Sequence, residues 1–427
     1  MSHPLRVIEL FAGVGGFHLG LANNSNHKQQ NNNYKIVWAN QWEPPGSVTK
    51  QFAYRCYESH FKNETLLDEY SNEDITKVLD AVEVGTYQLP KCNLLVGGFP
   101  CQDYSVARPL SQAHGIEGKK GILWWQIYRM LNLMGKEKPE YLFLENVDRM
   151  LKSPAKQRGR DFAIILCCLA RLGYSVEWRA VNAADYGFPQ KRRRVYLFAK
   201  LDSRKWDLEN RVLEMGILAK ALPVKKDRLS FATFEIPDDP YVISKTFGTG
   251  AKTSPFMDSG AMQNFKVTTS KSEPLYSGPH HTLGEILLPE TEVPENYFVD
   301  ENSTEKWKYH KGGKREERTN KNTGFRYYYT EGSMAYPDNL DGPSRTILTG
   351  EGGSAPSRSK HIVKTKSGKL RRLLPEELEA LNGFPAGWTD TGMTDVQRAF
   401  CMGNALIVGI VKRIGIEIAQ DARISLD

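Results

Sequence analysis

Residues 93–102 read NLLVGGFPCQ, a short apolar run that ends in two glycines, a proline and a cysteine. The apolar run predicts a buried strand, and the glycine pair allows a sharp turn and the close approach of a ligand. Pro100 restricts its own φ and the conformation of Phe99, so the Cys101 side chain is presented in a defined direction. Open α/β sheets bind their ligands at the carboxyl ends of the strands. We therefore interpret Cys101 as a candidate nucleophile, against the alternative that it is a small buried core residue.

The composition is that of an ordinary soluble globular protein. The chain has 427 residues, 40% hydrophobic and 25% charged, which is enough for two domains and a large core. We expect no membrane span and no secretory signal, because no apolar run approaches about 20 residues and no basic region precedes an apolar core. The six cysteines show no C-x-x-C spacing, so neither a disulfide framework nor a metal site is predicted. A cytoplasmic location is the default expectation.

Residues 6–200 alternate between strand-like and helix-like segments. Short β-branched or aromatic runs predict strands at residues 6–11, 36–40, 93–99, 141–145, 175–181 and 194–199. Segments with helical periodicity, such as residues 123–134 and 161–172, lie between several of these runs. The alternation predicts an α/β fold with a largely parallel sheet covered by helices.

The composition of the sequence changes after about residue 203. Gly, Pro, Ser and Thr become frequent there, and long segments with helical periodicity disappear. We expect residues 1–203 to form a first domain that carries the chemistry and residues 204–395 a smaller irregular domain. Pro375 and Gly383 delimit a short predicted helix within that second domain. Residues 396–427 contain an apolar helix at 405–419, which is too hydrophobic to stand alone and should pack back onto the first domain.

The net charge of +7 is concentrated in two windows of the second domain. Residues 306–326 contain eight Lys or Arg and two Glu, and residues 358–372 contain seven Lys or Arg and no acid. A charge run alone is more often a solvated surface than a binding site. Aromatic residues interleave with the first window, and this combination favours a nucleic-acid-binding face.

Two turns after predicted strands are typical of an adenosine-type ligand. Residues 11–16 read FAGVGG and follow the first strand, where glycines let the backbone approach the ligand closely. This turn lacks the full dinucleotide fingerprint, and no lysine follows it as in a phosphate-binding loop. Residues 40–43 read NQWE and end the second strand, where ribose-binding acids usually lie, and Asp74 offers a further carboxylate.

Charged side chains are also predicted near the nucleophile. Glu145 ends the apolar run 141–145, and a carboxylate at such a position is costly unless it has a partner or a task. If this strand neighbours the one that leads to Cys101, Glu145 can give a proton or hydrogen bond to the substrate. Residues 190–196 read QKRRRVY, and strand alternation places Arg192 and Arg194 on one face.

Taken in this order, the motifs resemble those of the DNA (cytosine-5) methyltransferases. The likeness comprises FAGVGG at 11–16, FPCQ at 99–102, ENV at 145–147, QKRRR at 190–194, residues 371–388 and the Gly-Asn pair at 403–404. The resemblance implies a Rossmann-like core that uses S-adenosylmethionine, with residues 204–395 as the target-recognition domain. The substrate would be a short specific sequence of double-stranded DNA. A prokaryotic restriction–modification type is implied, monomeric, without an obligate protein partner and paired functionally with a restriction endonuclease.

The resemblance further implies a covalent mechanism. The target cytosine would be flipped out of the duplex, Cys101 would attack C6, and Glu145 would hold and protonate N3. The activated C5 would take the methyl group, and elimination of Cys101 would release 5-methylcytosine. Arg192 and Arg194 complete the catalytic set, with Arg194 the more direct contact to the ring. The implied cofactor residues are Phe11, Gly13, Gly15, Gly16, Gln41, Trp42, Asp74, Ile75 and Asn404, and the implied DNA contacts are Gln102, Ser105, Arg345 and Thr346.

Some positions depart from the family pattern. Gln41 stands where the family usually has a Glu for the ribose hydroxyls, so either Gln41 or Glu43 is expected to take that role. Ala405 replaces the usual Ser after the Gly-Asn pair, and GKKG at 118–121 replaces the more usual Asp-x-Arg-Gly. The base-reading residues are not fixed by the sequence. The first candidates are Arg315, Arg318, Arg326, Arg345 and Arg358.

Three other functions compete with this interpretation. A related enzyme that acts on transfer RNA would carry a Cys-Phe-Thr triplet, which the chain lacks. A non-catalytic nucleic-acid-binding regulator would have lost the thiol or the carboxylate, yet Cys101 and Glu145 are both present. A nucleotide-binding oxidoreductase leaves the Cys, Glu and Arg set without a purpose.

Overall fold

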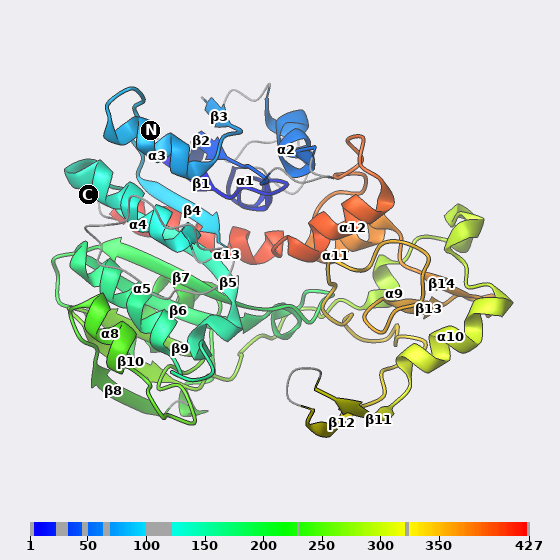
Figure 1. Cartoon of the computed structure of the whole chain (residues 1–427). Helices are drawn as coiled ribbons and strands as arrows, with labels where there is room; N and C mark the ends of the chain where they lie inside the picture. The colour runs from blue at the N-terminus through cyan, green and yellow to red at the C-terminus, as the bar shows by residue number, and fades with distance from the viewer. Residues whose placement is uncertain are drawn as a thin grey trace. The chain divides into compact units, whose positions relative to one another are not determined.

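The computed structural model describes residues 4–22, 33–44, 50–62, 69–99, 122–228, 230–320 and 324–424. The chain forms two compact units (Figure 1). The first unit comprises the chain up to Tyr186, residues 193–278 and the segment from Ile407 onward. The second unit comprises residues 187–192 and 279–406.

A ten-stranded mixed sheet organises the first unit, in the order β3-β2-β1-β4-β5-β7-β6-β9-β10-β8. The strands are β1 (Leu5–Leu10), β2 (Tyr34–Asn40), β3 (Glu69–Ser71), β4 (Leu94–Gly98), β5 (Tyr141–Val147), β6 (Tyr174–Asn182), β7 (Arg193–Leu201), β8 (Phe231–Glu235), β9 (Ser259–Gln263) and β10 (Lys266–Ser270). The predicted α/β fold is confirmed, and each predicted strand has its counterpart. The expectation of a largely parallel sheet holds only from β3 to β5, because β7 enters antiparallel to β5 and every later pairing is also antiparallel.

Helices cover both faces of this sheet, as Figure 1 shows. They are α1 (Gly16–Ala22), α2 (Phe52–Phe61), α3 (Ile75–Glu83), α4 (Ile122–Met134), α5 (Arg160–Arg171), α6 (Leu208–Asn210), α7 (Ile217–Ala221), α8 (Pro240–Thr246) and α13 (Val408–Ile424). Strand alternation in β5 separates two layers. Leu142 and Leu144 join one apolar core with residues of α3, α4, α5 and α8. Phe143 contacts Phe17 of α1 edge to face, with ring centroids 5.1 Å apart.

The last helix is a core helix of the first unit. By length and hydropathy alone, Asp395–Arg423 would be able to cross a membrane. Ile410, Val411, Ile414 and Ile418 of α13, however, are fully buried, although Ile416 is exposed. A Cβ added to Gly20 of α1 would lie 2.7 Å from Val411. The predicted return of the 405–419 helix to the first part of the chain is therefore found in α13.

The structure draws the boundaries differently from the predicted domains 1–203, 204–395 and 396–427. Residues 231–270 supply β8, β9 and β10, and β9 pairs with β6, so the sheet continues well beyond residue 203. Residues 193–278 accordingly belong to the first unit, while residues 396–406 belong to the second. The predicted boundary at residue 203 is wrong because these strands are short and separated by irregular segments rich in Gly, Pro and Ser, which do not resemble strands in the sequence.

The second unit has little regular structure. Its elements are α9 (Leu283–Ile286), α10 (Glu301–Lys311), β11 (Lys314–Thr319), β12 (Arg326–Glu331), β13 (Ile362–Lys364), β14 (Leu370–Arg372), α11 (Pro375–Asn382) and α12 (Asp395–Asn404). The predicted helix at 375–381 is confirmed as α11, which begins at Pro375 and ends before Gly383 in the left-handed region at φ 81°. Two-stranded ribbons, β11–β12 and β13–β14, replace a larger sheet.

Candidate active site

The glycine turn after β1 is held against the end of β2. The Gly13 amide donates to Oε1 of Gln41 at 2.8 Å, and the Ala12 amide donates to the carbonyl of Asn40 at 3.0 Å. Gly13 and Gly15 have φ of 58° and 90°, and a Cβ on Gly15 would lie 2.4 Å from the Phe61 ring. A Cβ on Gly13 would meet nothing closer than 4.0 Å, so this side of the turn is open. The turn therefore has the form that a closely approaching ligand requires.

Gln41 and Glu43 have different partners. Both carboxylate oxygens of Glu43 accept from the first amides of α2, those of Phe52 and Ala53, so this side chain caps the helix. The side-chain oxygen of Gln41 instead accepts from the glycine turn. The backbone carbonyl of Gln41 accepts from the Asn72 side chain at 2.7 Å. Of the two candidates for the ribose, the geometry favours Gln41.

The third strand end places Asp74 beside the same turn. Asn40 and Ser71 are paired in parallel strands β2 and β3, and the Asn40 side chain donates to the Glu73 carbonyl at 2.9 Å. Asp74 caps α3 by accepting from the Thr76 amide at 2.9 Å, and Ile75 begins the helix. The predicted cofactor residues from Phe11 to Ile75 thus gather at the carboxyl ends of three adjacent parallel strands. This set of glycines, an acid and an aromatic fits an adenosine-containing cofactor.

Glu145, the carboxylate that the sequence predicts to be catalytic, lies near the carboxyl end of β5. Gly98 of β4 is the parallel partner of Glu145, and Arg194 of β7 lies across from Val147. The Arg194 Nε is 2.9 Å from Oε1 of Glu145, and the two side chains are 17% and 12% exposed. A Cβ on Gly98 would lie 3.2 Å from Oε2 of Glu145, so the glycine leaves room for the carboxylate.

Residues 100–121 lie outside the described part of the chain, and with them Cys101, Gln102 and Ser105. The backbone that leads to them is fixed by a residue that the sequence analysis gave no role. Buried Asn146 donates from Nδ2 to the Phe99 carbonyl at 2.7 Å and accepts from the Val147 amide at 2.8 Å. Asn146 directly follows the predicted catalytic residue Glu145, and this position in the sequence could have indicated its role.

Arg192 and Arg194 do not share the environment that strand alternation suggested. β7 begins at Arg193, so Arg192 precedes the strand and the alternation does not reach it. Arg192 is 1% exposed and belongs to the second unit, where its guanidinium donates to the carbonyls of Gly403 at 3.0 Å and Ile347 at 3.4 Å. Arg194, in contrast, contacts the carboxylate of Glu145.

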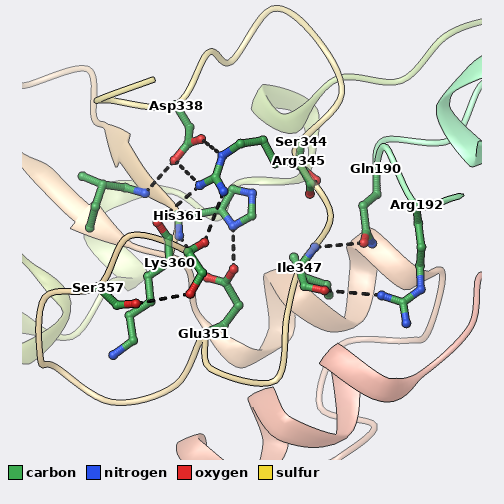
Figure 2. A network of polar contacts seen from close by, with 12 residues as sticks. Gln190, Arg192, Asp338, Ser344, Arg345, Ile347, Glu351, Ser357, Lys360 and His361 are labelled. Carbon is green, nitrogen blue, oxygen red and sulfur yellow. Dashed lines mark hydrogen bonds and ion pairs between the residues drawn. The ribbon is translucent and has the colours of Figure 1, made fainter. Parts of the chain in front are cut away.

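The segment that carries Arg345 and Thr346 is held by a polar network in the second unit. Figure 2 shows Arg345 directed toward Asp338 and Gln190 toward Ile347. Arg345 donates to both carboxylate oxygens of Asp338, at 2.6 and 3.1 Å, and the Thr346 hydroxyl donates to the Lys191 carbonyl. The Ile347 amide donates to Gln190 at 3.1 Å. This geometry favours a positioning role for Arg345 over a direct DNA contact.

The two basic windows differ in exposure. Lys360, Arg371 and Arg372 of the second window are buried, and Arg371 is paired with Glu377 at 2.7 Å. The prediction that this window forms a phosphate-binding face is therefore wrong for these three residues. The first window forms the ribbon β11–β12, where Arg315 and Arg318 lie over Tyr328 and Tyr329. Asn404 is exposed at the end of α12.

Together, the turn after β1 and the carboxylate near the end of β5 fit a Rossmann-like methyltransferase that uses S-adenosylmethionine. The profile of the C-5 cytosine-specific DNA methylases matches residues 5–420. The type II methyltransferase M.Sau3AI of Staphylococcus aureus is 43% identical over 436 residues, covering 100% of this chain and 98% of that protein. The chain belongs to the C-5 cytosine-specific DNA methylase family, and it is a DNA (cytosine-5-)-methyltransferase.

Other relatives match less of the sequence or only the fold. The type II methyltransferase M.HhaI of Haemophilus parahaemolyticus is 31% identical over 193 residues, covering 45% of this chain and 48% of that protein. The Dnmt2 methyltransferase of S. pombe has a similar fold, with a TM-score of 0.57 and 16% identity over 98% of this chain and 99% of that one. Entamoeba histolytica EhMeth gives the same TM-score and identity over 99% of both chains.

Proposed function

We propose that this enzyme methylates one cytosine within a short specific sequence of double-stranded DNA through a covalent bond between Cys101 and C6. The observation that carries the proposal is the pairing of Glu145 with Arg194 beside β4, the strand that leads to Cys101. A flipped cytosine is required because C5 and C6 cannot be reached inside the base stack.

The residues then have separate tasks. The thiolate of Cys101 adds to C6, and Glu145 gives a proton to N3, so that the electron pair is directed to C5. S-adenosylmethionine supplies the methyl group that C5 accepts. A base removes the C5 proton, the C6–S bond breaks to return the thiolate, and N3 gives its proton back to Glu145. Arg194 orients the Glu145 carboxylate and stabilises charge on the ring.

The cofactor residues follow from the same arrangement. Phe11, the open side of Gly13 and the amide of Gln41 would hold the adenosine, and Asp74 would accept from its amino group. Gly15 and Gly16 keep the backbone close at the start of α1, and Trp42 and Ile75 would enclose the base. Asn404 of the second unit stays a predicted contact.

The biological setting is proposed from the type II relatives. We infer that the enzyme protects its target sequence from a paired restriction endonuclease in the cytoplasm, and that it acts as a monomer without an obligate protein partner. The second unit would supply the target-recognition function, with Thr346 beside the flipped base.

Methyl transfer from labelled S-adenosylmethionine to unmodified duplex DNA tests the reaction, and bisulfite sequencing locates the product. Cytosines protected within one recurring short sequence are the expected result. Transfer to transfer RNA, and none to DNA, would contradict the proposal.

The covalent step is tested with Cys101→Ala, with Cys401→Ala as the matched control. The wild type and the control should form an adduct with DNA that carries 5-fluorocytosine, because fluorine at C5 cannot leave as a proton does. Cys101→Ala should bind DNA without forming the adduct or transferring methyl groups. Turnover by Cys101→Ala would disprove the role of this thiol.

A further inference from the structure

A cavity of about 430 Å³ lies in the first unit and is lined by residues that have no part in the site described above. Its lining includes four cations and one carboxylate, those of Lys152, Arg158, Lys252, Lys271 and Asp258. The three lysines are exposed and Arg158 is partly buried. None of these residues has a place in the methyl-transfer mechanism.

The single carboxylate of the cavity is already paired with a cation. Asp258 accepts from Nη2 of Arg193 at 2.6 Å, and the same guanidinium also pairs with Asp148 at 3.1 Å. Within the described chain, Lys152, Lys252 and Lys271 form no ion pair with a carboxylate. The cavity is therefore strongly positive, which suits an anion.

The cavity opens at the edge of the sheet that carries Glu145. The strands β5, β7, β6, β9 and β10 are paired antiparallel in succession, so the end of β5, the start of β7, the start of β9 and the end of β10 share one edge. Lys152 ends the 3-10 helix η3 (Asp148–Lys152) after β5, Asp258 precedes β9, and Lys271 follows β10. Arg193 joins the cavity to the strand that presents Arg194.

We propose that this cavity binds a backbone phosphate of the duplex that flanks the target cytosine. The inference rests on the proposed function, because the duplex is the polyanion that this edge meets during methylation. Lysine ammonium groups and an arginine fork are the usual partners of DNA phosphates, and such contacts fix position without reading sequence. The first unit would thus anchor the DNA independently of base recognition.

The test compares Lys252→Gln/Lys271→Gln with Lys91→Gln/Lys136→Gln. Both double variants remove two charges from exposed lysines of the first unit, and the control pair precedes β4 and β5 at the opposite edge of the sheet. The cavity variant should raise the KM for duplex DNA several-fold, leaving kcat and the KM for S-adenosylmethionine within about twofold. The slope of log K against log salt for duplex binding should fall by about 0.9, for one lost phosphate contact.

Equal behaviour of the two double variants in KM and salt slope would overturn the proposal. A free anion is distinguished by titrating inorganic phosphate. If phosphate stabilises the wild type but not the cavity variant, and the DNA parameters stay unchanged, the cavity is an anion site unrelated to DNA. Duplex binding is measured apart from turnover, so a wild type that binds but never methylates would count against the proposed function alone.

Discussion

The first unit buries a continuous apolar layer between its sheet and helices, whereas the second unit encloses ion pairs in which both side chains are almost fully buried. One apolar cluster of the second unit is small and is formed by Val293, Tyr297 and Leu374. The second unit instead encloses Glu377 with Arg371 and Glu379 with Arg398. Apolar burial stabilises without direction, while buried charges fix geometry and become costly when one partner is removed. The difference suggests that the second unit is specified more by polar geometry than by hydrophobic packing.

Of the substitutions that test this difference, removal of the Glu379 side chain should cause the largest loss of stability. Its carboxylate is fully buried and accepts from the Gly387 and Thr389 amides as well as from Arg398. Glu379→Ala should therefore destabilise the second unit by about 3–5 kcal/mol in chemical unfolding. Glu376→Ala is the control, because Glu376 contacts the same Arg398 but is partly exposed, and about 1 kcal/mol or less is expected. If both variants lose a similar amount of unfolding free energy, burial of the ion pair does not determine how much it stabilises the second unit.

Arg192 and Arg194 provide the next test, since they are two residues apart but belong to different units. Arg194→Lys should lower kcat about 10²- to 10³-fold, because the Nε contact with Glu145 is lost, with little change in Tm. Arg192→Lys should mainly lower Tm, because buried carbonyls of Ile347 and Gly403 lose their donor. Single-turnover rates and thermal unfolding of both variants measure this split. A larger rate loss in Arg192→Lys would return that residue to the catalytic set.

The contrast also explains which features could be predicted from sequence. The fold of the first unit can be predicted because buried strands appear in the sequence as apolar runs. The ends of these strands carry glycines and single charged residues, such as Gly98 and Glu145. The extension from β8 to β10 was missed because three short strands with mixed composition resemble loops. In the second unit, Lys360 and Arg371 look like surface cations in the sequence. Lys360 donates to the carbonyls of Gly353 and Ala355, and Arg371 pairs with Glu377, so these partners are near in sequence. A run of cations nevertheless does not show that such side chains are buried.

A pH-dependent test uses two buried ionisable groups whose effects on stability change with pH in opposite directions. Burial raises the pKa of Glu9 in the first unit to about 8 and lowers the pKa of Lys311 in the second unit to about 8. Native Glu9 favours the neutral acid, so its unit should lose stability as the pH rises from 4.5 to 8, by at most about 1.4 kcal/mol per pH unit. Native Lys311 favours the neutral amine, so its unit should gain stability as the pH rises from 8 to 10.5.

Hydrogen exchange separates these two trends, after correction for the intrinsic pH dependence of exchange, because it reports each unit by its own amides. Glu9→Gln should flatten the pH dependence of protection in β1 between pH 4.5 and 8 and leave α10 unchanged. Lys311→Met should flatten the dependence in α10 above pH 8 and leave β1 unchanged. Each variant thus serves as the control for the other. A change in both units with either variant would show that they unfold as one, and the proposed difference between them would then concern contacts and not independent stability.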